Sequence, residues 1–248
     1  MGRQGVCLDM YQKYAYKRIK YFHVFSEYQL GIIKKILPGK VHYYAPLTLD
    51  DYGDANINSS NDKIRFLFFG YIKEYKRLDL LIRSFLDLRR SGFENIELII
   101  AGNCENWITY KSLIGNDRNI NSRIEVIPNR DIPNIVASCH YMVLPYQDSA
   151  QSAVLTLAYQ YRKPVVVSNI EAFKQFVIEG ETGFYFENGQ QASLTNVLRN
   201  VIMNHEKDYS IYEEKIESFV QKEFALESIL NKYRSFLNDS IQRESILC

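Results

Sequence analysis

The sequence predicts an α/β fold built on a doubly wound parallel sheet, together with a partial α/β fragment at the amino-terminal end. Six short apolar segments alternate with stretches in which apolar residues recur at helical spacing, which is typical of strands joined by helices. The first segment, Ile64–Phe69, has five apolar residues out of six, as expected of a strand buried in a parallel sheet. Hydrophobic residues make up 46% of the 248-residue chain, enough for a sizeable core.

The first 53 residues predict only part of a domain. Their pattern favours a basic helix over residues 8–20, a strand over 21–25, a helix from 26 to 37 and a strand over 41–44. Two short strands and two helices are too few to enclose a core of their own. We therefore assign residues 1–53 as the remnant of a larger α/β domain.

A polar stretch rich in Gly, Asn, Ser and Asp follows, and we assign residues 54–62 as a linker. The main domain then covers residues 63–208, and residues 209–248 form the carboxyl-terminal helices. Strands of the main domain are expected at Ile64–Phe69, Ile96–Ala101, Arg123–Ile127, Tyr141–Leu144, Pro164–Ser168 and Phe184–Phe186. Helices are expected at Leu78–Arg90, Trp107–Ile114, Pro133–Ser138, Ser152–Tyr161, Ala172–Ile178 and Ala192–Met203, with a long one from Tyr209 to Leu237.

The turn after the first strand of the main domain has the composition of an anion site. Gly70 follows the strand, and the turn before the helix that begins at Leu78 carries Lys73 and Lys76. Open α/β sheets bind ligands at the carboxyl ends of their strands. Helix-start amides and two ammonium groups suit an anion such as a diphosphate. The alternative is a solvated turn whose lysines bind no ligand.

A second loop should meet the first at the same edge of the sheet. The strand that ends at Leu144 is followed by a loop of small polar residues, and a helix begins near Gln151. Ser149 or Gln151 is expected to cap that helix. One loop then supplies cations and the other supplies free amides at the positive end of a helix dipole. Together the two loops predict a pyrophosphate site.

Composition argues against several other classes of protein. Thirty basic and 29 acidic side chains leave a net charge of +1, so bulk charge gives no reason to expect nucleic acid as a partner. The four cysteines show no CxxC spacing, and the histidines are scattered, which argues against a disulfide framework or a metal site. No apolar run is long enough to cross a bilayer, and we expect a cytoplasmic protein. The basic first helix has two open interpretations: peripheral contact with the inner face of a membrane, or packing on a neighbouring domain.

Five stretches in order resemble one known family. FGYIKEYKRLDLLIRSF, ELIIAG and LPYQDSAQSAVLTLAYQYRKPVVVSNIEAFKQFVIEGETGFYF look like the nucleotide-binding half of family-4 (group 1) glycosyltransferases of the GT-B fold, over roughly residues 60–205. HVFSEYQ and the later YYAPL, within residues 22–47, resemble the end of the preceding acceptor domain. The last helix, around Phe224 to Leu237, resembles the one that crosses back to that domain.

This resemblance implies a retaining, metal-independent transfer of a sugar from a UDP- or GDP-sugar to a glycan or lipid-linked acceptor, as in surface polysaccharide synthesis. It requires no cofactor, because the nucleotide-sugar is a substrate. Carried over by position, Lys76 matches the family's lysine on the diphosphate, and Lys73 supplies the second cation where Tyr71 replaces a common arginine. The donor-binding set that it implies is Gly70, Tyr71, Asn129 near the nucleobase, Ser149, Gln151, and the amides of Ser152, Ala153 and Val154.

The sequence departs from the family at its Glu-x7-Glu motif. Counted back from Pro164, the two acidic positions are Ser149 and Leu157, so the implied contacts to the sugar and ribose hydroxyls are missing. Gln151-Ser152-Ala153 resembles a QSG-type variant of the family with the same loss.

Most of the acceptor domain is also absent, so a missing amino-terminal half or a partner subunit is expected. The alternative function is a catalytically silent nucleotide-binding subunit, or a truncated fragment, that supports a partner transferase. A nicotinamide-dependent Rossmann enzyme is disfavoured because no GxGxxG motif is present.

Overall fold

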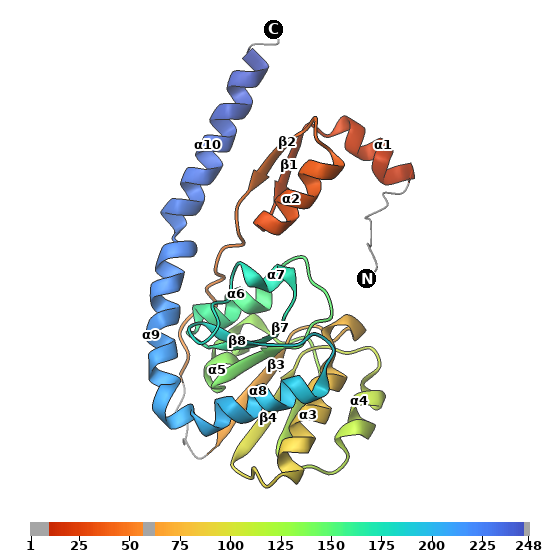
Figure 1. Ribbon diagram of the computed structural model, residues 1–248, viewed down its shortest axis with the longest axis vertical. Coiled ribbons are helices and arrows are strands. Elements are labelled where there is room, and N and C mark those ends of the chain that lie inside the picture. The colour runs from red at the N-terminus through yellow and green to blue at the C-terminus, as the bar shows by residue number, and fades with distance from the viewer. Residues whose placement is uncertain (1–9, 57–62, 246–248) are drawn as a thin grey trace. The chain divides into compact units, whose positions relative to one another are not determined.

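The computed structural model describes residues 10–56 and 63–245, with side chains for 14–56 and 63–238 (Figure 1). The described chain divides into two compact units. Unit 1 combines the residues up to Pro46 with those from Glu227 onward, and unit 2 is Leu47–Leu226. Part of the expected linker, residues 57–62, lies outside the described residues, as do the first two residues of the expected first helix.

Unit 1 is a small α/β layer. Its elements are α1 (Met10–Arg18), β1 (Tyr21–Val24), α2 (Glu27–Ile36), β2 (Val41–Tyr44) and most of α10 (Leu226–Ser245). β1 and β2 pair in parallel. Ser26 caps α2 by accepting a hydrogen bond from the Gln29 amide. The Tyr43 ring stacks on Phe236 of α10, with ring centroids 4.6 Å apart, so aromatic contacts hold α10 to the two strands.

Unit 2 contains the main sheet. Its strands are β3 (Ile64–Phe69), β4 (Ile96–Ala101), β5 (Ile120–Arg123), β6 (Tyr141–Leu144), β7 (Val165–Ser168) and β8 (Gly183–Phe186). All neighbours pair in parallel, in the order β5-β4-β3-β6-β7-β8. The chain therefore winds outward from β3, returns to β6 and winds outward on the other side. This is the doubly wound order, and it confirms the predicted fold class.

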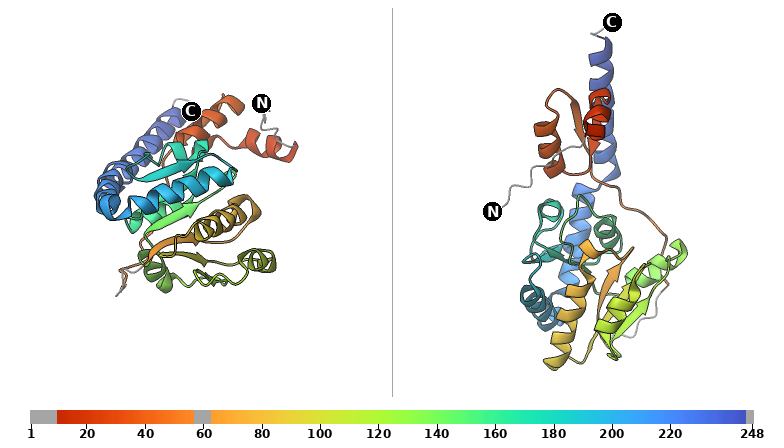
Figure 2. Two further views of the ribbon diagram at one scale, coloured as in Figure 1. Left: turned by 60° about the horizontal axis from the view of Figure 1, so that its bottom comes forward. Right: turned by 90° about the vertical axis from the view of Figure 1, so that its right-hand side faces the viewer.

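Helices cover both faces of the sheet, as right-handed crossovers require (Figures 1 and 2). α3, α4 and α8 pack on one face, and α5 and α6 lie on the other. The helical elements of this unit are η1 (Glu74–Lys76), α3 (Leu78–Arg90), α4 (Trp107–Ile114), η2 (Asn129–Asp131), α5 (Ile132–Ala137), α6 (Ala153–Gln160), α7 (Glu171–Lys174), α8 (Gln191–Met203) and α9 (His205–Glu223).

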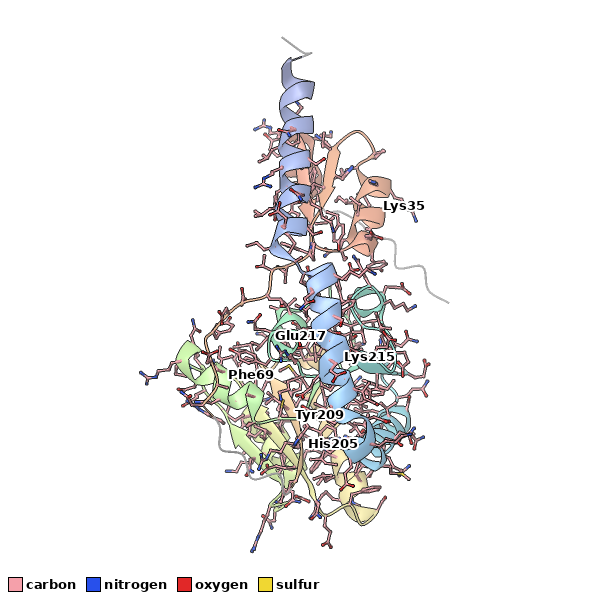
Figure 3. All side chains as sticks on the ribbon, turned by 90° about the vertical axis from the view of Figure 1, so that its left-hand side faces the viewer. Lys35, Phe69, His205, Tyr209, Lys215 and Glu217 are labelled. Atoms are coloured by element: carbon pink, nitrogen blue, oxygen red, sulfur yellow. The ribbon has the colours of Figure 1, made fainter. Side chains whose placement is uncertain are left out.

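The core forms because the central strands are apolar on both faces. Phe66, Leu67 and Phe68 are fully buried, and all four residues of β6 and of β7 are buried. α9 contacts Tyr141, the first residue of β6, through the rings of His205 and Tyr209, which Figure 3 labels. The His205 ring hydrogen-bonds to the Tyr141 hydroxyl, with Nδ1 3.1 Å from the oxygen.

Three expected elements differ from the structure. The strand expected at 123–127 is three residues earlier, at Ile120–Arg123, and Val126 is 76% exposed. The helix expected at 172–178 has only four residues, Glu171–Lys174. The single long helix expected to end at Leu237 is two helices, because buried Phe224 turns inward between α9 and α10 and packs on Phe219 and Tyr159.

Candidate functional site

Two loops meet where the winding of the sheet reverses. One follows β3 and the other follows β6, and these two strands are neighbours. The Gln147 amide donates to the Tyr75 carbonyl at 2.7 Å, which joins the loops directly. The Asn188 side chain donates to the Gln147 carbonyl at 2.9 Å and ties in the loop after β8. A crevice at such a switch point is the usual ligand site of open α/β sheets.

Lys76 is the buried cation of this site. It ends η1 and is only 8% exposed. Its Nζ lies 5.3 Å from the ring centroid of Tyr146, and a β-carbon built on Gly70 would be 3.4 Å from both this Nζ and Val154 Cγ2. Residues from both loops thus surround one point. Within the described part of the chain, the ammonium has no hydrogen-bond acceptor and no carboxylate partner.

The buried surroundings of Lys76 destabilise its charged form. Burial lowers the pKa of Lys76 below the ordinary lysine value. The next residue, Arg77, is held in the left-handed region at φ 51° and ψ 43°, a costly conformation for a side-chain-bearing residue, before α3 begins. A buried ammonium that has no partner among the described residues costs free energy unless an anion pairs with it.

The start of α6 supplies the second half of the site. Ser152 caps the helix, and its Oγ accepts from the Leu155 amide at 3.3 Å. The sequence expectation that Ser149 or Gln151 is the cap was wrong. The amides of Ser152, Ala153 and Val154 donate to no acceptor among the described residues, so they stay free for a ligand at the positive end of the helix.

Gly102 is a further site residue that sequence reasoning missed. It follows β4 at φ +147°, and a β-carbon there would lie 2.1 Å from the Gly70 carbonyl oxygen. The Gly70 amide donates to the Ala101 carbonyl at 2.9 Å. The two backbones touch, so only glycine at position 102 leaves Gly70 in place. The signal in the sequence is the Ala-Gly pair directly after an apolar strand.

Tyr71 and Lys73 form a separate, exposed group with Glu105. The Tyr71 hydroxyl donates to Glu105 Oε1, and Lys73 Nζ lies 3.4 Å from the same oxygen. Lys73 also lies over the Tyr71 ring at 4.5 Å. Desolvation lowers the pKa of Lys73, but its interactions with Glu105 and Tyr71 together outweigh this, so the pKa of Lys73 is raised overall. Lys73 thus already has a carboxylate partner, whereas Lys76 has none among the described residues.

The remaining positions singled out in the sequence lie in three different settings. Ser149 Oγ donates to the Gln151 carbonyl at 3.0 Å, inside the loop before α6. Asn129 begins η2, beyond the end of β5, and is exposed. Leu157, at the second position of the expected acidic pair, is 5% exposed and belongs to the core.

The described residues were also searched for a metal site and for a membrane-spanning helix. They contain no group of three or more His, Cys, Asp or Glu side chains placed to hold a metal ion. Among the described helices, none combines the length and the apolar character needed to span a bilayer.

A family model and a curated relative that match this chain both belong to glycosyltransferases. Residues 54–218 match the family model described as glycosyl transferases group 1. A curated protein of Methanocaldococcus jannaschii, the uncharacterized glycosyltransferase MJ1069, is 26% identical over 175 residues, which are 70% of this chain and 44% of that protein.

Solved structures share the fold at low sequence identity. Sucrose-phosphate synthase of Thermosynechococcus elongatus superposes with a TM-score of 0.78 at 14% identity, over 94% of this chain and 61% of that one. Anabaena HepE, solved in complex with UDP and glucose, gives a TM-score of 0.76 at 15% identity, over 92% of this chain and 65% of that one. The chain thus spans 44% of the curated relative and less than two thirds of each of these two solved chains.

Proposed function

The chain belongs to the group 1 glycosyltransferase family, and on that premise we propose that unit 2 binds a nucleotide diphosphate-sugar between Lys76 and the start of α6. The observation that carries the proposal is the buried ammonium of Lys76 near the start of α6, where the amides of Ala153 and Val154 donate to no acceptor among the described residues. A β-carbon on Gly70 would lie 3.4 Å from both Lys76 Nζ and Val154 Cγ2. A diphosphate is the group that satisfies the ammonium and the amides at once, because its oxygens accept charge-assisted hydrogen bonds from ammonium and amide donors.

The proposed reaction moves the sugar from the nucleotide diphosphate to an acceptor hydroxyl. The bond from the anomeric carbon to the diphosphate oxygen breaks, a bond to the acceptor oxygen forms, and the hydroxyl proton is released. Negative charge builds on the departing diphosphate, so fixed donors aimed there stabilise the transition state more than the ground state. Lys76 and the α6 amides have this role, and Gly70 lets the backbone approach the donor.

Lys73 has a secondary role in the proposal. Its ammonium is exposed and already held by Glu105, so it adds long-range attraction for the donor rather than a desolvated contact. Retention at the anomeric carbon, a metal-independent mechanism and an acceptor in glycan or lipid-linked form stay proposals carried by the family resemblance. Asn129, near the end of β5, remains the candidate contact for the nucleobase.

UDP is the nucleotide to test first. HepE, which has the same fold, was solved with UDP and glucose, and TarM of S. aureus was solved with UDP. GDP is the alternative. The sequence does not indicate which sugar is transferred, because Ser149 and Leu157 replace the acidic pair that contacts sugar and ribose in many family members.

A silent donor-binding subunit is the second candidate, and one observation favours it. The second acidic position of the family motif is occupied here by the core residue Leu157. Such a protein would bind the nucleotide and support a partner transferase without transferring sugar itself.

The test measures release of UDP or GDP from the corresponding sugar donors, with the chain alone and with the amino-terminal half of a family relative supplied. Donor turnover that disappears in Lys76→Ala supports the transferase. Nucleotide binding without turnover under both conditions supports the silent subunit. Absence of nucleotide binding contradicts both.

A further inference from the structure

Unit 1 contains a cationic cavity that the donor site does not explain. The cavity has a volume of about 650 Å³ and lies between α2, β2 and α10. Three of its lining residues are lysines, and none is acidic. The lining residues are Lys34, Pro38, Lys40, Val41, His42, Tyr43, Lys232, Ser235 and Phe236.

Two of the lysines are held in place without being neutralised. Lys40 Nζ donates to the Lys17 carbonyl at 2.7 Å, and Lys232 Nζ lies 4.7 Å from the ring centroid of Tyr44. Neither contact supplies a negative charge. Over the described residues, Lys34, Lys40 and Lys232 have no carboxylate partner. Their positive field therefore reaches the cavity unopposed.

Two buried polar side-chain atoms beside the cavity have no hydrogen-bond partner among the described residues. His42 Nε2 and the Tyr43 hydroxyl are buried side-chain atoms without a hydrogen bond in the described part of the structure. Tyr43 as a whole is 8% exposed. Buried polar atoms are normally paired, and each unpaired one costs about 1–3 kcal/mol. Both residues line the cavity, but these two atoms are covered by protein, so the three lysines are the groups that a ligand there would meet.

The charge along the chain agrees with this picture. Residues 10–46 hold seven Lys and Arg side chains and a single acidic one, Glu27, whereas the whole chain carries only +1. The positive charge of the protein is thus concentrated in the segment that forms most of the cavity. An anion with several charged oxygens, on a polar or amphipathic molecule, is the ligand that matches it.

We propose that this cavity of unit 1 binds a phosphate or pyrophosphate group, separately from the donor site of unit 2. The group belongs either to a lipid headgroup or to a soluble phosphorylated molecule, and the chemistry of recognition is the same for both. Lys34, Lys40 and Lys232 neutralise its oxygens, and Phe236 lies beside the organic part. The proposal is independent of whether unit 2 transfers sugar.

The experiment uses the full chain carrying Lys76→Ala, so that the donor site no longer contributes its ammonium. Inorganic pyrophosphate binding is measured by calorimetry before and after adding Lys34→Gln, Lys40→Gln and Lys232→Gln. Lys35→Gln is the matched control, since Lys35 is the neighbouring lysine on the outer side of α2 and does not line the cavity (Figure 3). We expect the triple change to weaken binding at least about tenfold and Lys35→Gln to leave it unchanged.

A second arm identifies the source of the phosphate. Cosedimentation with phosphatidylcholine vesicles, with and without phosphatidylglycerol, is compared for the same variants. Binding to anionic vesicles that the triple change removes assigns a lipid headgroup, and pyrophosphate binding alone assigns a soluble ligand. Equal pyrophosphate affinity in the triple variant and the Lys35→Gln control, or no binding in either, overturns the proposal. UDP binding by the triple variant with Lys76 intact verifies that unit 2 is folded.

Discussion

The Nζ atom of Lys76 lies 3.4 Å from the position that a β-carbon on Gly70 would take, and Val154 approaches the same position equally closely. The end of β3, the η1 turn and the start of α6 thus converge on one point at the switch of the sheet. This convergence is the physical basis of the proposed diphosphate site, and it gives the predictions below.

Replacing Gly70 with alanine should weaken nucleotide binding. Its φ of +96° disfavours any side chain, and the added methyl meets Lys76 and Val154. We expect the free energy of unfolding to fall by about 1–2 kcal/mol. Gly92→Ala is the matched control, because its φ is +91° and nothing lies within 4 Å of its added methyl. Both variants should lose similar stability in urea titrations, but only Gly70→Ala should lose UDP affinity. Equal UDP affinity in the two would contradict this assignment.

Gly102→Ala should have a larger effect on the site, although position 102 supplies no side chain to a ligand. The new methyl would lie 2.1 Å from the Gly70 carbonyl oxygen, so the loop after β3 has to move. We expect a loss of about 2–3 kcal/mol in unfolding free energy and no measurable UDP binding by calorimetry. Unchanged UDP affinity would show that the loop tolerates the shift.

Lys76→Met should stabilise the protein while weakening its nucleotide affinity. A buried ammonium without a partner costs free energy, and methionine has a similar shape without the charge. We expect a gain of about 1 kcal/mol near neutral pH. Urea unfolding of wild type and variant measures it, and a less stable variant would contradict it.

The same cost predicts a pH dependence. Burial lowers the pKa of Lys76 in the folded protein. Below that lowered pKa, Lys76 is charged in the folded and the unfolded protein, so the free-energy cost of burying its charge is fully present. Above it, the unfolded chain still binds the proton and the folded chain does not. Wild-type stability should therefore rise with pH toward the ordinary lysine value of 10.5, and this component should be missing in Lys76→Met.

Much of the fold was predictable because the central strands and helices carry strong local signals. The buried strands Ile64–Phe69 and Ile96–Ala101 and the amphipathic helix Leu78–Arg90 were predicted at their observed bounds. β5 was not, because it is an edge strand in which three of four residues are exposed, so its hydrophobic pattern is weak. The break at Phe224 was also missed, since a buried aromatic continues a helical pattern as readily as it ends one.

The candidate site was predictable in its cations but not in its detail. Lys76 and Lys73 look alike in the sequence, and only tertiary packing buries one and pairs the other with Glu105. The contact between Gly102 and Gly70 joins two separate strands, so no local pattern contains it. The sequence does not decide which residue caps α6, because three nearby polar residues could each do so and only the loop geometry selects Ser152.

Acid should destabilise unit 2 through His140. Burial first, then the charges of His205, Lys163 and Arg65, lower the pKa of His140 from 6.5 to about 4. Between these two pKa values the unfolded chain binds the proton that the folded chain refuses, so stability falls as pH drops through this window, by at most about 3 kcal/mol. His140→Asn keeps an acceptor for the Arg65 amide, which donates to His140 Nδ1 at 2.9 Å. Urea unfolding from pH 7 to about 4 should show a flatter slope for this variant; an identical slope would contradict the assignment.

The central claim is that the Lys76 ammonium and the start of α6 bind one diphosphate, and a UDP titration tests it most directly. Calorimetry with wild type, Lys76→Ala and Lys73→Ala compares a buried lysine with an exposed one in the same turn. We expect Lys76→Ala to raise the Kd for UDP at least about tenfold and Lys73→Ala to raise it by only about two- to threefold. A Lys76→Ala protein that binds UDP as tightly as wild type would contradict the account.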